Sequence, residues 1–173
     1  MKRLYLVIIN GFSGSGKDEF CSMCQEFMLK QGKSTWVKHS SDFAKSVLYG
    51  MNWDGERTPE VRQLLTDLVS FGEITGSNLE DLYIFVKNNS MFSTIFYHER
   101  NPIEIQKIVD NYKNQIGVTT ITVLVNRGML SRIEKDKWNL DEFTYDVLVN
   151  NFGTLEDLKV SAESFCKDFL LEV

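Results

Sequence analysis

The sequence has no excess of positive charge. Its 19 lysine and arginine residues are outnumbered by 24 aspartate and glutamate residues, which gives a formal net charge of −5 at pH 7. Broad binding of nucleic acid or of an anionic membrane needs clustered basic side chains that neutralise phosphates. We therefore expect neither nucleic acid nor a membrane among the partners. The composition leaves room for a small cationic pocket.

Long hydrophobic runs are also missing. The apolar run Leu4–Ile9 follows two basic residues, as in a secretory signal, but it is short and leads into a glycine-rich segment without a cleavage site of small residues. No other segment approaches the roughly 18 apolar residues that a membrane span needs. These absences predict a soluble protein.

Cysteine is scarce, and linker sequences are absent. The chain has 3 cysteines, and this odd number favours a reducing cytosol over a disulfide framework, so we expect a cytoplasmic location. There is no Pro- or Ser-rich linker, low-complexity tract or internal repeat. With 173 residues and 43% hydrophobic content the chain can build one core of ordinary size, which predicts a single domain over residues 1–173.

Two of the cysteines lie close together in "CSMC", residues 21–24. A zinc site would need two further ligands, and the other candidates, His39, His98 and Cys166, show no paired spacing. We therefore predict that Cys21 and Cys24 pack inside a helix.

The hydrophobic period switches repeatedly between strand and helix. Short apolar segments with the pattern of strands are separated by stretches with helical spacing, which predicts βαβ units and a parallel sheet covered on both sides. The strand segments are residues 4–9, 34–40, 93–98, 118–125 and part of 142–150.

Capping signals predict where two of the helices begin or end. The first helix is expected to end at Gly32, and Thr58 and Pro59 are expected to be the N-cap and first residue of a later helix. The apolar stripe of the first helix is predicted to be Phe20, Cys24, Phe27 and Gln31, and that of the later helix Val61, Leu64, Leu65, Leu68 and Val69.

A glycine-rich loop follows the first strand segment. Residues 10–20, "NGFSGSGKDEF", contain Gly-x-x-x-x-Gly-Lys between an apolar run and an amphipathic helix. Glycines let backbone N–H groups converge on phosphate oxygens, the helix N-terminus adds partial positive charge, and Lys17 supplies a mobile cation. The alternative is an ordinary glycine-rich turn with an exposed lysine. The predicted ATP-binding residues are Gly11, Ser13, Gly14, Ser15, Gly16, Lys17, Asp18 and Glu19.

Asp18 stands where such loops usually carry Ser or Thr. The usual hydroxyl coordinates Mg²⁺, and a carboxylate oxygen can serve the same hard cation. We therefore predict Asp18 as the metal ligand and expect unusually strong dependence of ATP binding on Mg²⁺, because the carboxylate repels the triphosphate. If Asp18 only complements the helix dipole, Ser13 or Glu99 is the alternative ligand.

The loop "GFSGSGKD" resembles that of a P-loop kinase subgroup with Gly-Lys-Asp, which includes phage deoxynucleoside monophosphate kinases, animal phosphomevalonate kinases and related bacterial kinase-like proteins. "GMNWDGERTPEVRQLLTDL" resembles the segment of these kinases that receives the acceptor, and "FYHERNP" resembles the His-x-Arg-x-Pro pattern that closes their third strand. "YDVLVNNFGTLEDL" is similar to the fifth strand, adenine-side loop and last helix of nucleoside monophosphate and dephospho-coenzyme A kinases.

This resemblance implies an α/β fold, the P-loop NTPase three-layer sandwich. Its five-stranded parallel sheet would have the order 2-3-1-4-5 with helices on both faces, an acceptor-binding insert at about residues 40–90 and a short lid at about residues 126–142. One departure is Asn101, which stands where relatives often carry an acidic residue between the Arg and the Pro.

The lid segment "NRGMLSRIEKDKW" offers four basic residues. Catalysis of phosphoryl transfer is mostly positioning and electrostatics, so we expect Arg127 and Arg132 to act with Lys17 in neutralising the transferring group. Lys135 and Lys137 are interpreted as part of a solvated surface turn.

Three further residues are predicted to bind the acceptor. Arg100 follows the third strand segment at its C-terminal end, where ligands sit in open α/β sheets, and forked guanidinium donors match phosphate oxygens. Arg62 lies on the polar side of its helix and is alternatively a plain solvent-exposed residue. Asp42 is a candidate base or hydroxyl-positioning group, or alternatively complements a helix dipole.

The predicted function is Mg²⁺-dependent transfer of a phosphoryl group from ATP to a nucleoside or deoxynucleoside monophosphate. One alternative is a kinase of another small phosphorylated metabolite. Another is a nucleotide-binding module without transferase activity. The acceptor's base and sugar and the oligomeric state stay open.

Overall fold

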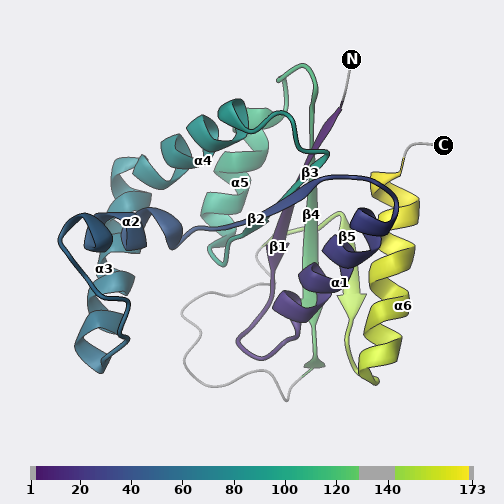
Figure 1. The fold of residues 1–173 in the computed structure, drawn as a ribbon, viewed down its shortest axis with the longest axis horizontal. Helices are drawn as coiled ribbons and strands as arrows, with labels where there is room; N and C mark the ends of the chain where they lie inside the picture. Colours follow the sequence, from purple (N-terminus) through teal and green to yellow (C-terminus); the bar gives the residue numbers. More distant parts are fainter. Residues whose placement is uncertain (1–2, 129–142, 172–173) are drawn as a thin grey trace. The chain divides into compact units, whose positions relative to one another are not determined.

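The computed structural model describes residues 3–128 and 143–171, which form two compact units (Figure 1). Unit 1 comprises Met1–Val37 and Ser90–Val173, and unit 2 comprises Lys38–Asn89. Among the described residues, no helix combines the length and the apolar character that crossing a membrane requires.

A five-stranded parallel sheet is the centre of the fold. Its order is β2-β3-β1-β4-β5, so the predicted order 2-3-1-4-5 is confirmed. The central strand β1 pairs in parallel with both β3 and β4, and every residue of β1 is buried, in keeping with its apolar sequence from Leu4 to Ile9. The strands are β1 (Leu4–Asn10), β2 (Thr35–His39), β3 (Thr94–His98), β4 (Val118–Asn126) and β5 (Val147–Asn150).

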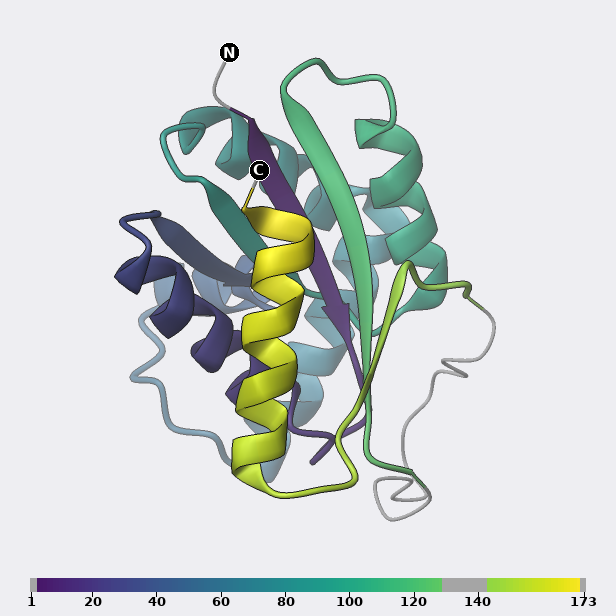
Figure 2. The same ribbon diagram turned by 90° about the vertical axis from the view of Figure 1, so that its right-hand side faces the viewer.

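Helices cover both faces of this sheet, as predicted. Figures 1 and 2 show α1 and α6 on one face and α5 on the other. On the α1 and α6 side, Val7 and Ile9 of β1 pack in one buried cluster with Phe20 and Phe165, whose rings lie 5.6 Å apart. The helices are α1 (Lys17–Lys30), α5 (Pro102–Tyr112) and α6 (Leu155–Phe165), and α6 continues as the π-helical turn η3 (Cys166–Leu170).

The buried stripe of α1 differs from the predicted one. Phe20, Cys21, Cys24 and Met28 are buried, whereas Phe27 is only half-buried and Gln31 is exposed. Gln31 is the C-cap and therefore lies beyond the last turn that faces the sheet. Gly32 follows with a left-handed φ of 68°, at the position where the helix was predicted to end.

The cysteines pack in the core, as predicted. Cys21, Cys24 and Cys166 are all free thiols in buried positions. Burial raises the pKa of the Cys21 and Cys24 thiols far above the ordinary value, so both stay neutral at physiological pH. They act as small apolar side chains between α1 and the C-terminal helical segment.

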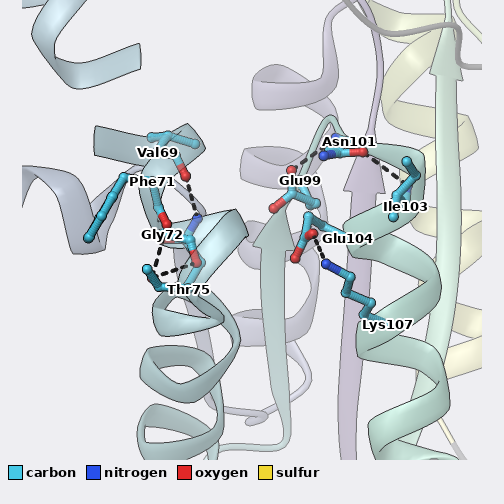
Figure 3. A network of polar contacts seen from close by, with 10 residues as sticks. Val69, Phe71, Gly72, Thr75, Glu99, Asn101, Ile103, Glu104 and Lys107 are labelled. Atoms are coloured by element: carbon cyan, nitrogen blue, oxygen red, sulfur yellow. Dashed lines mark hydrogen bonds and ion pairs between the residues drawn. The ribbon is translucent and has the colours of Figure 1, made fainter. Parts of the chain in front are cut away.

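Unit 2 contains three helices that pack on one another, α2 (Asp42–Gly50), α3 (Pro59–Thr75) and α4 (Ser77–Asn88). The predicted start of α3 is confirmed, because the Thr58 side chain accepts a hydrogen bond from the Val61 N–H and Pro59 is the first helical residue. Thr75 donates to the Phe71 carbonyl at the end of α3 (Figure 3). The predicted stripe of α3 is mostly half-buried, and its Leu64 is exposed.

Candidate active site

The loop of residues 11–16 connects the end of β1 to the start of α1 (Figure 1). Gly14 and Gly16 have left-handed φ angles of 75° and 88°, which L-residues with side chains rarely adopt. The Ser15 N–H donates to the Phe12 carbonyl over 3.1 Å, which closes the loop on itself. The backbone thus curls tightly at the N-terminus of a helix, where amide groups and the helix dipole favour an anion.

Lys17 is buried although it carries a charge, with only 7% of its surface exposed. It lies in the first turn of α1, where the helix dipole disfavours a positive charge. Its Nζ lies 3.9 Å from a carboxylate oxygen of Asp18. A bound anion would offset both the cost of burying the Lys17 charge and its repulsion by the helix dipole. The alternative, an exposed lysine on an ordinary turn, does not fit a lysine that is buried.

Ser15 adds a second sign of an anion site. Its hydroxyl is buried and has no hydrogen-bond partner among the described residues. A buried hydroxyl without a partner is costly, so such atoms in native proteins usually meet a ligand or water. The loop residues therefore fit a phosphate group.

Glycine is required at position 11 because neighbouring atoms leave no room for a side chain, and not because of a backbone dihedral angle. A Cβ at this position would lie 2.7 Å from the Val125 carbonyl oxygen and 2.5 Å from the Ser15 hydroxyl. We expect Gly11→Ala to displace the loop and to weaken ATP binding by about tenfold or more, because relieving such overpacking costs about 1–3 kcal/mol. Calorimetric titration with Mg²⁺-ATP measures this loss.

Gly32→Ala is the matched control for that substitution. Gly32 also has a left-handed φ, of 68°, but a Cβ there would meet nothing within 4 Å. This variant should lose about 1 kcal/mol of stability from backbone strain and keep its ATP affinity. Equal ATP affinities for the two variants would contradict the loop assignment.

Asp18 faces a histidine from the neighbouring strand. An Asp18 carboxylate oxygen lies 3.2 Å from Nδ1 of His98, the last residue of β3, and His98 is buried whereas 66% of the Asp18 side chain is exposed. Within residues 3–128 and 143–171, no three or more His, Cys, Asp or Glu side chains gather as a metal cage. Mg²⁺ typically takes one or two carboxylates and completes its shell with phosphate oxygens and water, so an exposed Asp18 beside the loop fits a metal that arrives with a nucleotide.

The Glu99 side chain forms hydrogen bonds with the backbone of the two residues that follow it. One of its carboxylate oxygens accepts hydrogen bonds from the N–H groups of Arg100 and Asn101, at 2.7 and 2.9 Å. Asn101 in turn caps α5, because its side chain accepts from the Ile103 N–H over 3.0 Å (Figure 3). The departure at Asn101 is therefore explained by helix capping. The Arg100 side chain is exposed at the C-terminal end of the sheet.

Two buried asparagines, which the sequence analysis did not single out, hold the loop in place. Asn10 accepts from the Gly11 N–H over 2.7 Å and donates to the Arg100 carbonyl at 3.2 Å and to the Tyr145 hydroxyl at 2.7 Å. Asn151, which follows β5, donates to the Ser15 carbonyl over 2.9 Å. Their only sequence signal is a polar residue at the end of an apolar strand.

Solved structures of other proteins share the fold of this chain, although its sequence matches no family model and no curated protein. Among solved structures, the APS kinase CysC of Mycobacterium tuberculosis in complex with AMPPNP and APS is 13% identical, with 96% of this chain and 99% of that chain covered and a TM-score of 0.52. A cysteine-to-alanine mutant of the same kinase gives 14% identity, the same coverage and a TM-score of 0.50. A protein named APE1195 is 14% identical, with 99% of each chain covered and a TM-score of 0.61.

The chain has the P-loop NTPase fold. Identities this low establish the fold alone, and the sheet order and the strand, loop and helix succession agree with it. Residues 11–17, which we call the P-loop after their Gly-x-x-x-x-Gly-Lys motif, lie between the central strand of this fold and α1.

The predicted acceptor residues are distributed over both units. Arg100 belongs to unit 1, whereas Asp42 and Arg62 belong to unit 2. Arg62 is exposed, and its Nε donates to the Arg57 carbonyl over 3.3 Å. Arg127 follows β4 and is exposed, whereas Arg132, Lys135 and Lys137 lie outside the described residues, as does most of the predicted lid.

Asp42 has a structural role in unit 2. Its carboxylate accepts from the His39 N–H over 2.8 Å and pairs with Lys45 Nζ over 2.7 Å. Partial burial raises the pKa of the Asp42 carboxyl, but the hydrogen bonds from Lys45 and His39 and the Lys45 charge outweigh it, so the pKa lies below its ordinary value. The ionised form is therefore favoured in the native protein.

We expect Asp42→Asn to lower stability at pH 7 by about 1 kcal/mol. Because the native pKa of Asp42 is depressed, its contribution is present above the unfolded-state value near pH 4 and is lost as pH falls through the native value. Urea denaturation of both proteins between pH 7 and about pH 3 should show the difference shrinking. A fall in turnover of more than about 100-fold at unchanged stability would instead favour the role of a catalytic base.

Proposed function

We propose that this chain transfers the γ-phosphoryl group of ATP to a nucleoside or deoxynucleoside monophosphate, in a Mg²⁺-dependent reaction. The observation that carries this proposal is the burial of Lys17 at the N-terminus of α1, beside the buried hydroxyl of Ser15 that has no partner among the described residues. A buried cation, a polar atom that lacks a partner and a helix N-terminus together make a site for the phosphates of a nucleotide.

Different P-loop residues would bind different parts of the Mg²⁺-ATP complex. Backbone N–H groups of Ser13, Gly14 and Gly16 and the hydroxyl of Ser15 would hold the phosphates. Lys17 would neutralise the charge that shifts towards the leaving oxygen. Asp18 would hold the metal, with Glu19 beside it in the first turn of α1. Bound Mg²⁺ supplies charge neutralisation at the outer phosphates.

The acceptor would be oriented by cationic and acidic side chains. Arg100 and Arg62 would bind its phosphate through forked donors, and Asp42 would position it. Arg127 and Arg132 would neutralise the transferring group from the lid side. Such positioning and charge neutralisation account for most of the catalysis in phosphoryl transfer.

A panel of acceptors tests the proposal. Each nucleoside and deoxynucleoside monophosphate, and phosphomevalonate as a non-nucleotide acceptor, is incubated with Mg²⁺-ATP, and ADP release is compared with the water-only background. Release with one or more nucleoside monophosphates supports the proposal. Release with phosphomevalonate alone indicates another metabolite kinase, and ATP binding without release above background indicates a nucleotide-binding module.

Two properties accompany the proposal. A small-molecule acceptor would be the partner, in keeping with the acidic net charge of −5. The odd number of cysteines, all buried and free, supports a cytoplasmic location.

A further inference from the structure

An aromatic pair lies at the end of α2 in unit 2. The rings of Tyr49 and Trp53 have centroids 4.9 Å apart and planes inclined by 34°. Tyr49 keeps 56% of its surface exposed although it is a large aromatic residue. Tyr49 therefore presents ring surface to solvent, whereas Trp53 is half-buried.

The backbone fixes this pair firmly. Beyond the end of α2, Asn52 adopts a left-handed φ of 65°, its N–H donates to the Tyr49 carbonyl, and the Trp53 N–H donates to the Leu48 carbonyl, each over 3.0 Å. This is the double hydrogen bond of a Schellman motif, and it sets the position of Trp53 relative to Tyr49. The indole N–H of Trp53 then donates to the Glu56 carbonyl over 2.8 Å, which fixes the ring itself.

The loop that holds Trp53 also holds a guanidinium group. Trp53 Nε1 binds the carbonyl of Glu56, and Arg62 Nε binds the carbonyl of the next residue, Arg57, over 3.3 Å. Two successive carbonyls thus tie the indole and the guanidinium to one short stretch of chain. The nearby carboxylate of Asp54 accepts from the Glu56 N–H over 2.8 Å and stabilises the turn.

We propose that Tyr49 and Trp53 form the binding surface for the aromatic base of the acceptor, and that Arg62 binds the acceptor's phosphate. This inference rests on the proposed function and adds to it the residues that select a nucleotide over a phosphorylated metabolite without a ring. Stacking on an aromatic side chain is favourable for every base, because every base has a π-face, whereas a ring-free acceptor gains nothing from it. Since a hydrogen bond to the Glu56 carbonyl holds the Trp53 ring before binding, that ring loses little conformational entropy on association.

Binding without ATP tests the proposal apart from catalysis. Each nucleoside monophosphate is titrated into the full chain while tryptophan emission is followed, with ribose 5-phosphate as the matched ligand that lacks the base. We expect saturable quenching by at least one nucleoside monophosphate, at least about tenfold weaker binding of ribose 5-phosphate, and loss of the quenching in Trp53→Phe. Quenching that persists in Trp53→Phe, or equal affinities for the two ligands, would overturn the proposal.

Tyr49→Leu tests the second ring by turnover. The variant should raise the KM for the nucleoside monophosphate by about tenfold and leave the KM for ATP within about twofold, because only the acceptor stacks on this ring. Tyr49→Phe retains the ring and should restore most of the affinity.

Trp36→Leu is the matched control. Trp36 is also an aromatic residue with 46% exposure and a ring partner, Phe92, at 5.4 Å, but it lies on β2 in unit 1. Its substitution should leave the acceptor KM unchanged, and an equal rise in both variants would contradict the proposal. If quenching follows the expected pattern but no monophosphate is phosphorylated, the base surface stands and only the proposed transfer fails.

Discussion

Lys17→Ala is expected to reduce phosphoryl transfer by about 100- to 1000-fold, the usual cost of removing one preorganised charge from a phosphoryl or acyl transition state. ATP binding should weaken as well, because the lysine serves the outer phosphates. The free energy of unfolding should stay equal or rise, since the variant removes a buried positive charge from the first turn of α1. ADP release with Mg²⁺-ATP and urea denaturation measure the two effects.

Lys30 provides the control on the same helix. It lies in the last turn of α1, is exposed, and pairs with Glu26 over 2.7 Å. Lys30→Ala should keep full turnover and change stability by less than about 1 kcal/mol. Unchanged turnover in Lys17→Ala itself would rule out the proposed kinase activity.

Asp18→Asn should change ATP affinity in opposite directions with and without the metal. Without Mg²⁺, loss of a negative charge beside the triphosphate should strengthen binding by about fivefold, the equivalent of roughly 1 kcal/mol of Coulomb repulsion. With Mg²⁺, loss of the carboxylate ligand should weaken binding and lower turnover. Calorimetric titration of both proteins with ATP, with and without Mg²⁺, measures the two shifts.

Opposite signs distinguish metal binding from a general effect on the helix. If Asp18 only complements the helix dipole, Asp18→Asn costs at most about 1 kcal/mol of stability and shifts affinity equally in both conditions. Glu19→Gln removes a charge of the same sign from the same turn and gives the size of that dipole effect. Equal shifts for Asp18→Asn would mean that the metal has a different protein ligand, such as Ser13.

The sheet was predictable because its signals are local. A strand buried on both faces is mostly apolar, as β1 is from Leu4 to Ile9, and the Thr58 and Pro59 cap follows from hydrogen bonds within one helical turn. The position of the glycine-rich loop between β1 and α1 was predictable for the same reason, since the glycines, the helix start and Lys17 are adjacent in sequence. By contrast, the predicted stripe of α1 was wrong at Gln31, because a helical period alone does not show where the last turn leaves the sheet.

Contacts between distant residues could not be predicted from local patterns. The approach of His98 to Asp18 depends on the pairing of β3 with β1, and the bond from Asn151 to the Ser15 carbonyl joins residues 136 positions apart. Asn101 illustrates a related difficulty. Compared with the kinases that the sequence resembles, Asn101 looks like a missing carboxylate, but in the structure it is a helix cap.

The hydrogen bonds of Asn10 have a consequence for the order of folding. They join the start of the P-loop to groups 90 and 135 residues away along the chain. Contacts between such distant residues form late, because the entropy of closing long loops must be overcome first. Helix α1 has local hydrogen bonds and can form early, whereas β1 pairs only with the distant strands β3 and β4. The loop between them therefore acquires its final shape only when β3 and the segment before β5 are in place. The nucleotide affinity that we propose would therefore depend on the complete fold, and an isolated fragment of β1, loop and α1 would lack it.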